Sequence, residues 1–191
     1  MGKIWITSDC HFNHVRILDY NRDTRPFSSP QEMNETIIRN WNECVRPEDI
    51  VFVVGDFFMG QKETISEILP QLNAERIYVI RGNHDTDNRI AEYEKDPRAL
   101  VYDHMILFYR NKFYVMNHYP LEGDFAHNNH LKGDGWKNAT EFFYEHSEDS
   151  VYLYGHTHES NFHKTRNVFH IGMDGNNCYP HLLDDIADLV E

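Results

Sequence analysis

Short apolar segments recur along this chain, and each is followed directly by a polar loop that carries histidine, aspartate or asparagine. Brief runs rich in Val, Ile, Phe and Tyr predict β-strands. Because ligands of open α/β sheets bind beyond the carboxyl ends of the strands, we expect these loops to face one common site. The predicted strands are Ile4–Thr7, Ile50–Val54, Ile77–Ile80, Phe113–Met116 and Val151–Tyr154.

The first half of the chain alternates between such strands and helical patterns. Ser29–Glu32 reads as a capping box with proline at the first helical position, and apolar residues then recur every four positions from Met33 to Val45. A second helix is expected at about 61–73, with Pro70 kinking it or marking its end. This alternation suggests βαβ units.

The second half predicts further strands and a short closing helix, so the fold class is α/β with a mixed sheet or two packed sheets between helices. We interpret residues 1–191 as a single domain. The elements expected here are a hairpin of Ile106–Tyr109 with Phe113–Met116, strands at 151–154 and 167–172, and a helix near 182–190.

Residues 119–149 form a long, weakly periodic connection rich in Gly, Asn and His. A long irregular segment beside a site is typical of a lid or specificity element. The alternative is a surface excursion that contains one short helix around Ala139–His146.

Charge and composition narrow the function. Lys and Arg total 18 against 31 Asp and Glu, for a net charge of −13, which disfavours binding to long nucleic acid but not to a small phosphate ester. No apolar run approaches the length of a membrane span, and the chain starts with a strand pattern, so the cytoplasm is the expected location. Three cysteines without C-x-x-C spacing argue against disulfides and a thiolate zinc site.

The loops supply enough oxygen and nitrogen donors for two divalent ions. Asp9 and His11 are two positions apart, so extended backbone would point both side chains the same way, and His156 and His158 repeat this spacing. Imidazole with carboxylate suits Zn, Mn, Fe or Ni. The candidate ligands are Asp9, His11, Asp56, Asn83, His118, His156 and His158.

These motifs, in this order, resemble those of the calcineurin-like metallophosphoesterases. The matching segments are Asp9-Cys10-His11, Gly55-Asp56, Gly82-Asn83-His84-Asp85, His118 and Gly155-His156-Thr157-His158. The opening Ser-Asp-x-His-Phe-x-His and the helix from Met33 to Trp41 are similar to a small prokaryotic and phage-type branch of that superfamily. The resemblance implies a four-layer α/β/β/α sandwich.

The resemblance also implies roles for the individual residues. Asp9, His11 and His158 would hold one metal, and Asn83, His118 and His156 the other, with Asp56 bridging. A metal-bridging hydroxide would attack phosphorus in line with the leaving group. His84 would protonate that group or steady the phosphoryl oxygens.

The chain departs from many relatives just after the bridging aspartate. Met59 stands where an acid orients the catalytic histidine, and Gly60 where many phosphatases have arginine. Asp85 is the candidate substitute for the missing acid. His14, three residues after His11, is a candidate substrate contact, and Asp174 a candidate to line the site.

The remaining histidines show no pattern and are interpreted mainly as surface or incidental residues. They include His127, His130, His163, His170 and His181.

The leading hypothesis is a dinuclear metal-dependent phosphoesterase that acts on a small phosphomonoester or phosphodiester, with nucleotides among the candidates. Two alternatives stay open: a catalytically silent scaffold of the same fold, and a nuclease for short oligonucleotides.

Overall fold

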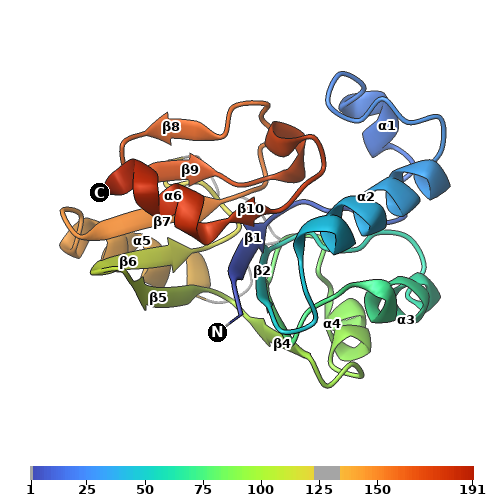
Figure 1. Cartoon of the computed structure of the whole chain (residues 1–191), viewed down its shortest axis with the longest axis horizontal. Coiled ribbons are helices and arrows are strands. Elements are labelled where there is room, and N and C mark those ends of the chain that lie inside the picture. The colour runs from blue at the N-terminus through green and yellow to red at the C-terminus, as the bar shows by residue number, and fades with distance from the viewer. Residues whose placement is uncertain (1, 123–133) are drawn as a thin grey trace.

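The computed structural model describes residues 2–122 and 134–191, which form two mixed five-stranded sheets (Figure 1). The first sheet has the order β10-β1-β2-β3-β4, with β10 antiparallel to β1 and the other neighbours parallel. The second has the order β5-β6-β7-β9-β8, with β6–β7 and β7–β9 parallel. The strands are β1 Ile4–Thr7, β2 Ile50–Val54, β3 Arg76–Ile80, β4 Ala99–Tyr102, β5 Met105–Tyr109, β6 Lys112–Met116, β7 Ser150–Tyr154, β8 His163–Thr165, β9 Val168–His170 and β10 His181–Leu182.

Helices flank both sheets. α2, α3 and α4 lie on the side of the first sheet that faces away from the second (Figure 1). α5 packs on the outer face of the second sheet, and α6 closes the end of the space between the sheets. The helices are α1 Ile17–Tyr20, α2 Pro30–Cys44, α3 Glu63–Ile68, α4 Asp87–Tyr93, α5 Gly135–Glu145 and α6 Leu183–Val190, with 3₁₀ turns η1 Leu69–Gln71 and η2 Met173–Asn176.

Strand β2 is apolar throughout because it is covered on both faces. Val51 and Val53 belong to the cluster under α2, whereas Phe52 and Val54 belong to the cluster between the sheets. Successive side chains of a strand point to opposite faces, so a strand covered on both faces needs a continuous apolar run. The predicted α/β sandwich is thereby confirmed as layers of helix, sheet, sheet and helix.

The five strands that precede the polar loops match their predicted positions within one residue. The helix expected at 61–73 is shorter: α3 ends at Ile68, and Pro70 sits in the 3₁₀ turn that follows. Five short elements were not predicted from the sequence, because none has a clear periodic pattern of its own. They are α1, α4, β4, β8 and β10.

The predicted capping box of α2 is half confirmed. The Ser29 hydroxyl accepts a hydrogen bond from the Glu32 backbone N–H at 3.1 Å, as an N-cap does. The Glu32 carboxylate, however, accepts from the backbone and hydroxyl of Ser28, one residue before the cap. The helix start is therefore fixed by both serines.

The segment 119–149 lies partly outside the described residues, since 123–133 are not among them. Its final part is helical from Gly135, four residues before the expected start, and buries Ala139 and Phe143 against the second sheet. That part is a packed layer of the fold, and a lid or specificity role for the rest stays a prediction. Among the described residues, no helix is both long and apolar enough to cross a membrane.

The burial of Trp41 gives a stability prediction. Its side chain is fully buried between α2 and the first sheet, and its indole N–H donates to the Asn73 carbonyl at 2.8 Å. We expect Trp41→Ala to lower the free energy of unfolding by about 3–5 kcal/mol, measured by urea denaturation. Tyr20→Ala, which changes a side chain that is 72% exposed, serves as the control and should stay within about 0.5 kcal/mol. Equal losses in both variants would contradict this assignment of the core.

Candidate metal centre

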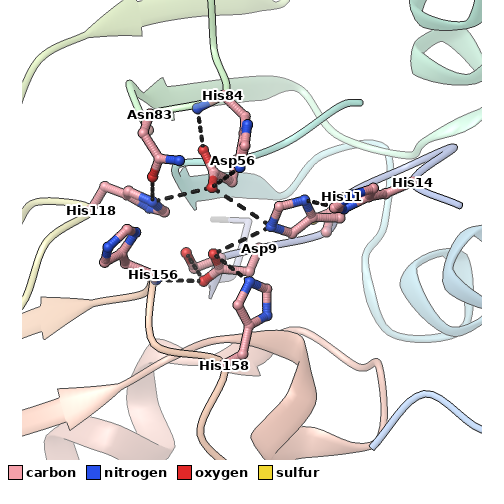
Figure 2. A network of polar contacts seen from close by, with 12 residues as sticks. Asp9, His11, His14, Asp56, Asn83, His84, His118, His156 and His158 are labelled. Atoms are coloured by element: carbon pink, nitrogen blue, oxygen red, sulfur yellow. Dashed lines mark hydrogen bonds and ion pairs between the residues drawn. The ribbon is translucent and has the colours of Figure 1, made fainter. Parts of the chain in front are cut away.

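The loops after β1, β2, β3, β6 and β7 meet where the carboxyl ends of both sheets come together (Figure 2). Backbone hydrogen bonds tie loops of the same sheet to each other. The Asp9 N–H donates to the Gly55 carbonyl at 3.0 Å in the first sheet, and the Gly155 N–H donates to the His118 carbonyl at 3.0 Å in the second. The site is therefore built by two sheets rather than one.

The candidate ligands sit on sharply turned backbone, not on extended strand. The expectation that extended backbone aligns Asp9 with His11, and His156 with His158, is wrong, because β1 ends at Thr7 and β7 at Tyr154. Left-handed backbone is uncommon outside glycine and costs about 1–3 kcal/mol per residue, and it clusters at functional sites. The φ angles are 54° at Asp9, 49° at His11, 51° at Asp56, 71° at His156 and 50° at His158.

Two glycines of the motifs are required by close approach. Gly55 has a φ of 89°, and a Cβ there would collide with the His118 ring. A Cβ at Gly155 would collide with the Ser8 hydroxyl. These residues allow the loops of the two sheets to come close enough to share one site.

Six of the seven predicted ligands form two groups of donors. In each group the potential ligand atoms all lie within 4.8 Å of one another. Asp56 Oδ2 is 3.3 Å from His118 Nε2 and 3.6 Å from His11 Nε2, so this carboxylate faces both groups. The groups are Asp9, His11 and His158, and Asp56, His118 and His156.

Asn83, the seventh predicted ligand, lies beside the second group. Its Oδ1 is 3.1 Å from His118 Nε2 (Figure 2). The structure thus brings all seven predicted ligands together.

Three of the histidines are oriented by a contact at Nδ1, which leaves Nε2 directed at the carboxylates. Such contacts fix the tautomer and ring orientation of metal-binding histidines. The pairs are His118 with the Val54 carbonyl at 2.9 Å, His158 with the Asp174 carboxylate at 2.9 Å, and His11 with His14 Nδ1 at 3.1 Å.

The donors fit a metal ion. Among the described residues, Asp9 Oδ1 and His11 Nε2 are buried without a hydrogen-bond partner, and the two atoms are 3.7 Å apart. A buried polar atom left unsatisfied costs about 1–3 kcal/mol. A cation bound by both atoms removes that cost, and this nitrogen and oxygen set without thiolate suits Zn, Mn, Fe or Ni.

The pKa values of Asp56 and His118 shift in opposite directions because the two side chains face each other. Burial by itself raises the pKa of Asp56, but His118 and His11 outweigh it and hold that pKa below its usual range. Burial disfavours the imidazolium of His118, yet the Asp56 carboxylate raises the pKa of His118 to about 10. A metal ion therefore has to displace a proton here.

Asp85 binds the backbone of two ligand loops. Its Oδ2 accepts from the backbone N–H of Asp56 at 2.8 Å and of Gly82 at 2.9 Å, and its Oδ1 accepts from the Tyr93 hydroxyl at 2.7 Å. The carboxylate is thus used by backbone groups and by Tyr93, and a role of Asp85 in orienting His84 stays a prediction. Asp85 fixes the Asp56 loop to the Asn83 loop.

His84 stands at the open side of the centre. Its side chain is 40% exposed, and Nε2 is 4.0 Å from Asp56 Oδ2. Its backbone is held at both ends: the N–H donates to Asp56 Oδ1 at 2.8 Å, and the carbonyl accepts from Arg89. The ring of His14 lies nearby, with centroids 6.2 Å apart.

The sequence did not predict a role for Arg25, and it indicated Asp174 only as a residue that lines the site. Arg25 is fully buried and pairs with Asp174, which also accepts from His158. No spacing rule points to an arginine in a loop far from the motifs. Only the position of Asp174 after a late strand gave a signal.

Two other histidines also differ from expectation. His170 and His181 are buried, at 0% and 9% exposure, rather than on the surface. His127 and His130 lie outside the described residues.

Comparison with known proteins agrees with this geometry. A sequence model of the calcineurin-like phosphoesterase superfamily domain matches residues 3–173. An uncharacterized protein of Methanocaldococcus jannaschii, MJ1445, is 38% identical over 135 residues, which is 68% of this chain and 70% of that protein. The Gene 66 protein of Mycobacterium phage L5 is 24% identical over 211 residues, covering 100% of this chain and 95% of its own.

A solved structure shares the fold. A protein of unknown function from Aquifex aeolicus, AQ665, superposes with a TM-score of 0.74 at 22% identity, covering 99% of this chain and 100% of its own. Because the superfamily match spans nearly the whole sequence, we conclude that the chain belongs to the calcineurin-like phosphoesterase superfamily and is a metal-dependent phosphoesterase.

Proposed function

We propose that this enzyme holds two divalent metal ions and hydrolyses a small phosphomonoester or phosphodiester, with nucleotides among the candidates. The observation that carries the proposal is the position of the Asp56 carboxylate. Its Oδ2 faces a histidine of each donor group, at 3.3 Å from His118 and 3.6 Å from His11. A carboxylate between two donor groups suits a bridge between two cations.

In this proposal each donor group would hold one ion, and Asp56 would serve both. Asp9, His11 and His158 would hold the first ion, and His118 and His156, joined by Asn83, would hold the second. When bound, the ions supply activation of a water molecule and neutralisation of charge on the phosphoryl oxygens.

His84 acts on the leaving group or on a phosphoryl oxygen. It is the exposed histidine of the centre, so its ring is available to a substrate that enters from solvent. The side chains of Asp56 and Arg89 hold the backbone of His84 in place, which supports this role although Met59 stands at the usual acidic position. General-acid assistance of this kind contributes about 10²–10⁴-fold.

The net charge of −13 favours small substrates over long nucleic acid. The full ligand set, with His84 present, disfavours a catalytically silent scaffold. Short oligonucleotides stay within the proposed substrate range.

The first test is hydrolysis of p-nitrophenyl phosphate and bis-p-nitrophenyl phosphate, with Mn²⁺ and with chelator. We expect turnover with Mn²⁺ and none with chelator, and the ratio of diester to monoester rates assigns the substrate class. Metal-loaded protein that cleaves neither compound, nor short oligonucleotides and mononucleotides, would overturn the proposal in favour of a scaffold.

A second test separates metal binding from catalysis. Asp56→Asn should lower the content of both ions and abolish turnover, because this carboxylate serves both donor groups. His84→Ala should retain the metal content of the wild type and lower kcat by about 10²–10⁴-fold. Metal content is measured by inductively coupled plasma mass spectrometry. An emptied site in His84→Ala would show that this residue is a ligand instead.

A further inference from the structure

A buried ion pair lies beneath one side of the metal centre. Arg25 and Asp174 have fully buried side chains, and their contact is bidentate: Nε donates to Asp174 Oδ1 at 2.9 Å and Nη2 donates to Oδ2 at 2.9 Å. The Thr24 hydroxyl adds a hydrogen bond to Asp174 at 2.7 Å. Asp174 is in η2, after the last strand of the second sheet, whereas Arg25 follows α1.

Each member of the pair also contacts a different part of the first donor group. Asp174 Oδ2 accepts from Nδ1 of His158, at 2.9 Å. Arg25 donates to the backbone carbonyl of Asp9 and, at 3.0 Å, to that of Cys10. It thereby holds the left-handed backbone between Asp9 and His11, whose φ angles are 54° and 49°.

The second donor group is supported by other means. Asp85 binds the backbone N–H of Asp56, and the Val54 carbonyl binds His118. In residues 2–122 and 134–191, no hydrogen bond of Arg25 or Asp174 reaches the side chains of Asp56, Asn83 or His118. The hydrogen bonds of Arg25 and Asp174 are thus directed to the first group.

We infer that Arg25 and Asp174 are positioning residues that selectively support binding of the ion held by Asp9, His11 and His158. The inference rests on the proposed two-metal function. Asp174 sets the ring of His158, and Arg25 keeps both Asp174 and the Asp9–His11 turn in place.

Physical reasoning favours this role over one in stability. A buried ion pair is weak evidence for stability, because desolvation of both charges offsets their attraction, and apolar replacements are often neutral. Outer-shell partners of metal-binding histidines, in contrast, typically change metal affinity about 10–100-fold when they are removed. The pair therefore costs little in stability to replace but should matter for one ion.

The test is to titrate metal-free protein with Mn²⁺ and to measure binding by isothermal titration calorimetry. Arg25→Met with Asp174→Leu replaces the whole pair by apolar side chains, so no unpaired buried charge is left. We expect two binding steps in the wild type, and in the double variant a loss of about 10–100-fold in the affinity of one step. Asp174→Asn is the second variant: it leaves Arg25 without its counterion, so it should weaken the same step at a larger cost in stability than the double replacement.

Repeating the replacement in variants that retain only one intact donor group shows which binding step is affected. In His156→Ala, which impairs the second group, replacing the pair should weaken the remaining ion about 10–100-fold. In His158→Ala, which impairs the first group, the same replacement should leave the remaining affinity unchanged. Equal effects in both backgrounds, or none in either, would overturn the inference.

Asp49→Asn is the matched control. Asp49 is 2% exposed, and its carboxylate accepts hydrogen bonds from Lys3, Trp5 and Arg46. It precedes β2, however, and so lies at the amino end of that strand, whereas the site lies at the carboxyl end. The variant should bind two ions as the wild type does, which shows that loss of a buried carboxylate is not itself enough. Wild-type protein that binds no Mn²⁺ would remove the proposed function, whereas two unweakened steps in the double variant would remove only this inference.

Discussion

Two buried carboxylates impose the central constraint on this molecule. Asp9 is 0% exposed and Asp56 is 2% exposed, and an oxygen of each lies within 3.7 Å of the same nitrogen of His11. Two negative charges repel each other strongly when they are this close and shielded from water. The histidines around them, the Ser8 hydroxyl and backbone N–H groups all act to keep both carboxylates ionised in the interior.

The sandwich architecture makes this concentration of charge feasible. Parallel pairing of β1 with β2 places Asp9 and Asp56 after neighbouring strands, and parallel pairing of β6 with β7 does the same for His118 and His156. The first sheet contributes both carboxylates and the second contributes three histidines, counting His158. Packing the sheets face to face therefore places the two carboxylates of the first sheet beside the three histidines of the second.

The sequence predicted the main strands and the meeting of the candidate ligands, for a physical reason. Apolar runs covered on both faces mark strands, and donors placed at their carboxyl ends meet regardless of loop detail. The loop detail itself was beyond reach. Left-handed backbone at Asp9 or His158 leaves no mark on a single sequence unless glycine is present, so the clustering of the candidate ligands was predicted from an incorrect backbone geometry.

Supporting residues were harder to predict than ligands. Asp85 is adjacent to His84 in sequence, which suggested that it orients His84, whereas its hydrogen bonds to the backbone of Asp56 and Gly82 could not be predicted. Arg25 acts through tertiary contacts only, and short edge elements such as β4 and β10 depend on the strands they join. Such features follow from the assembled fold and not from local pattern.

The separation of Arg25 from Asp174 in the sequence affects folding during synthesis. The two residues are 149 positions apart in the chain. At about 5–20 residues per second, a ribosome needs roughly 7–30 s to add the aspartate after the arginine. Until then the guanidinium lacks its counterion, and burying it alone is costly. The turn that carries Asp9 and His11 therefore acquires its final support only when nearly all of the chain has been synthesised.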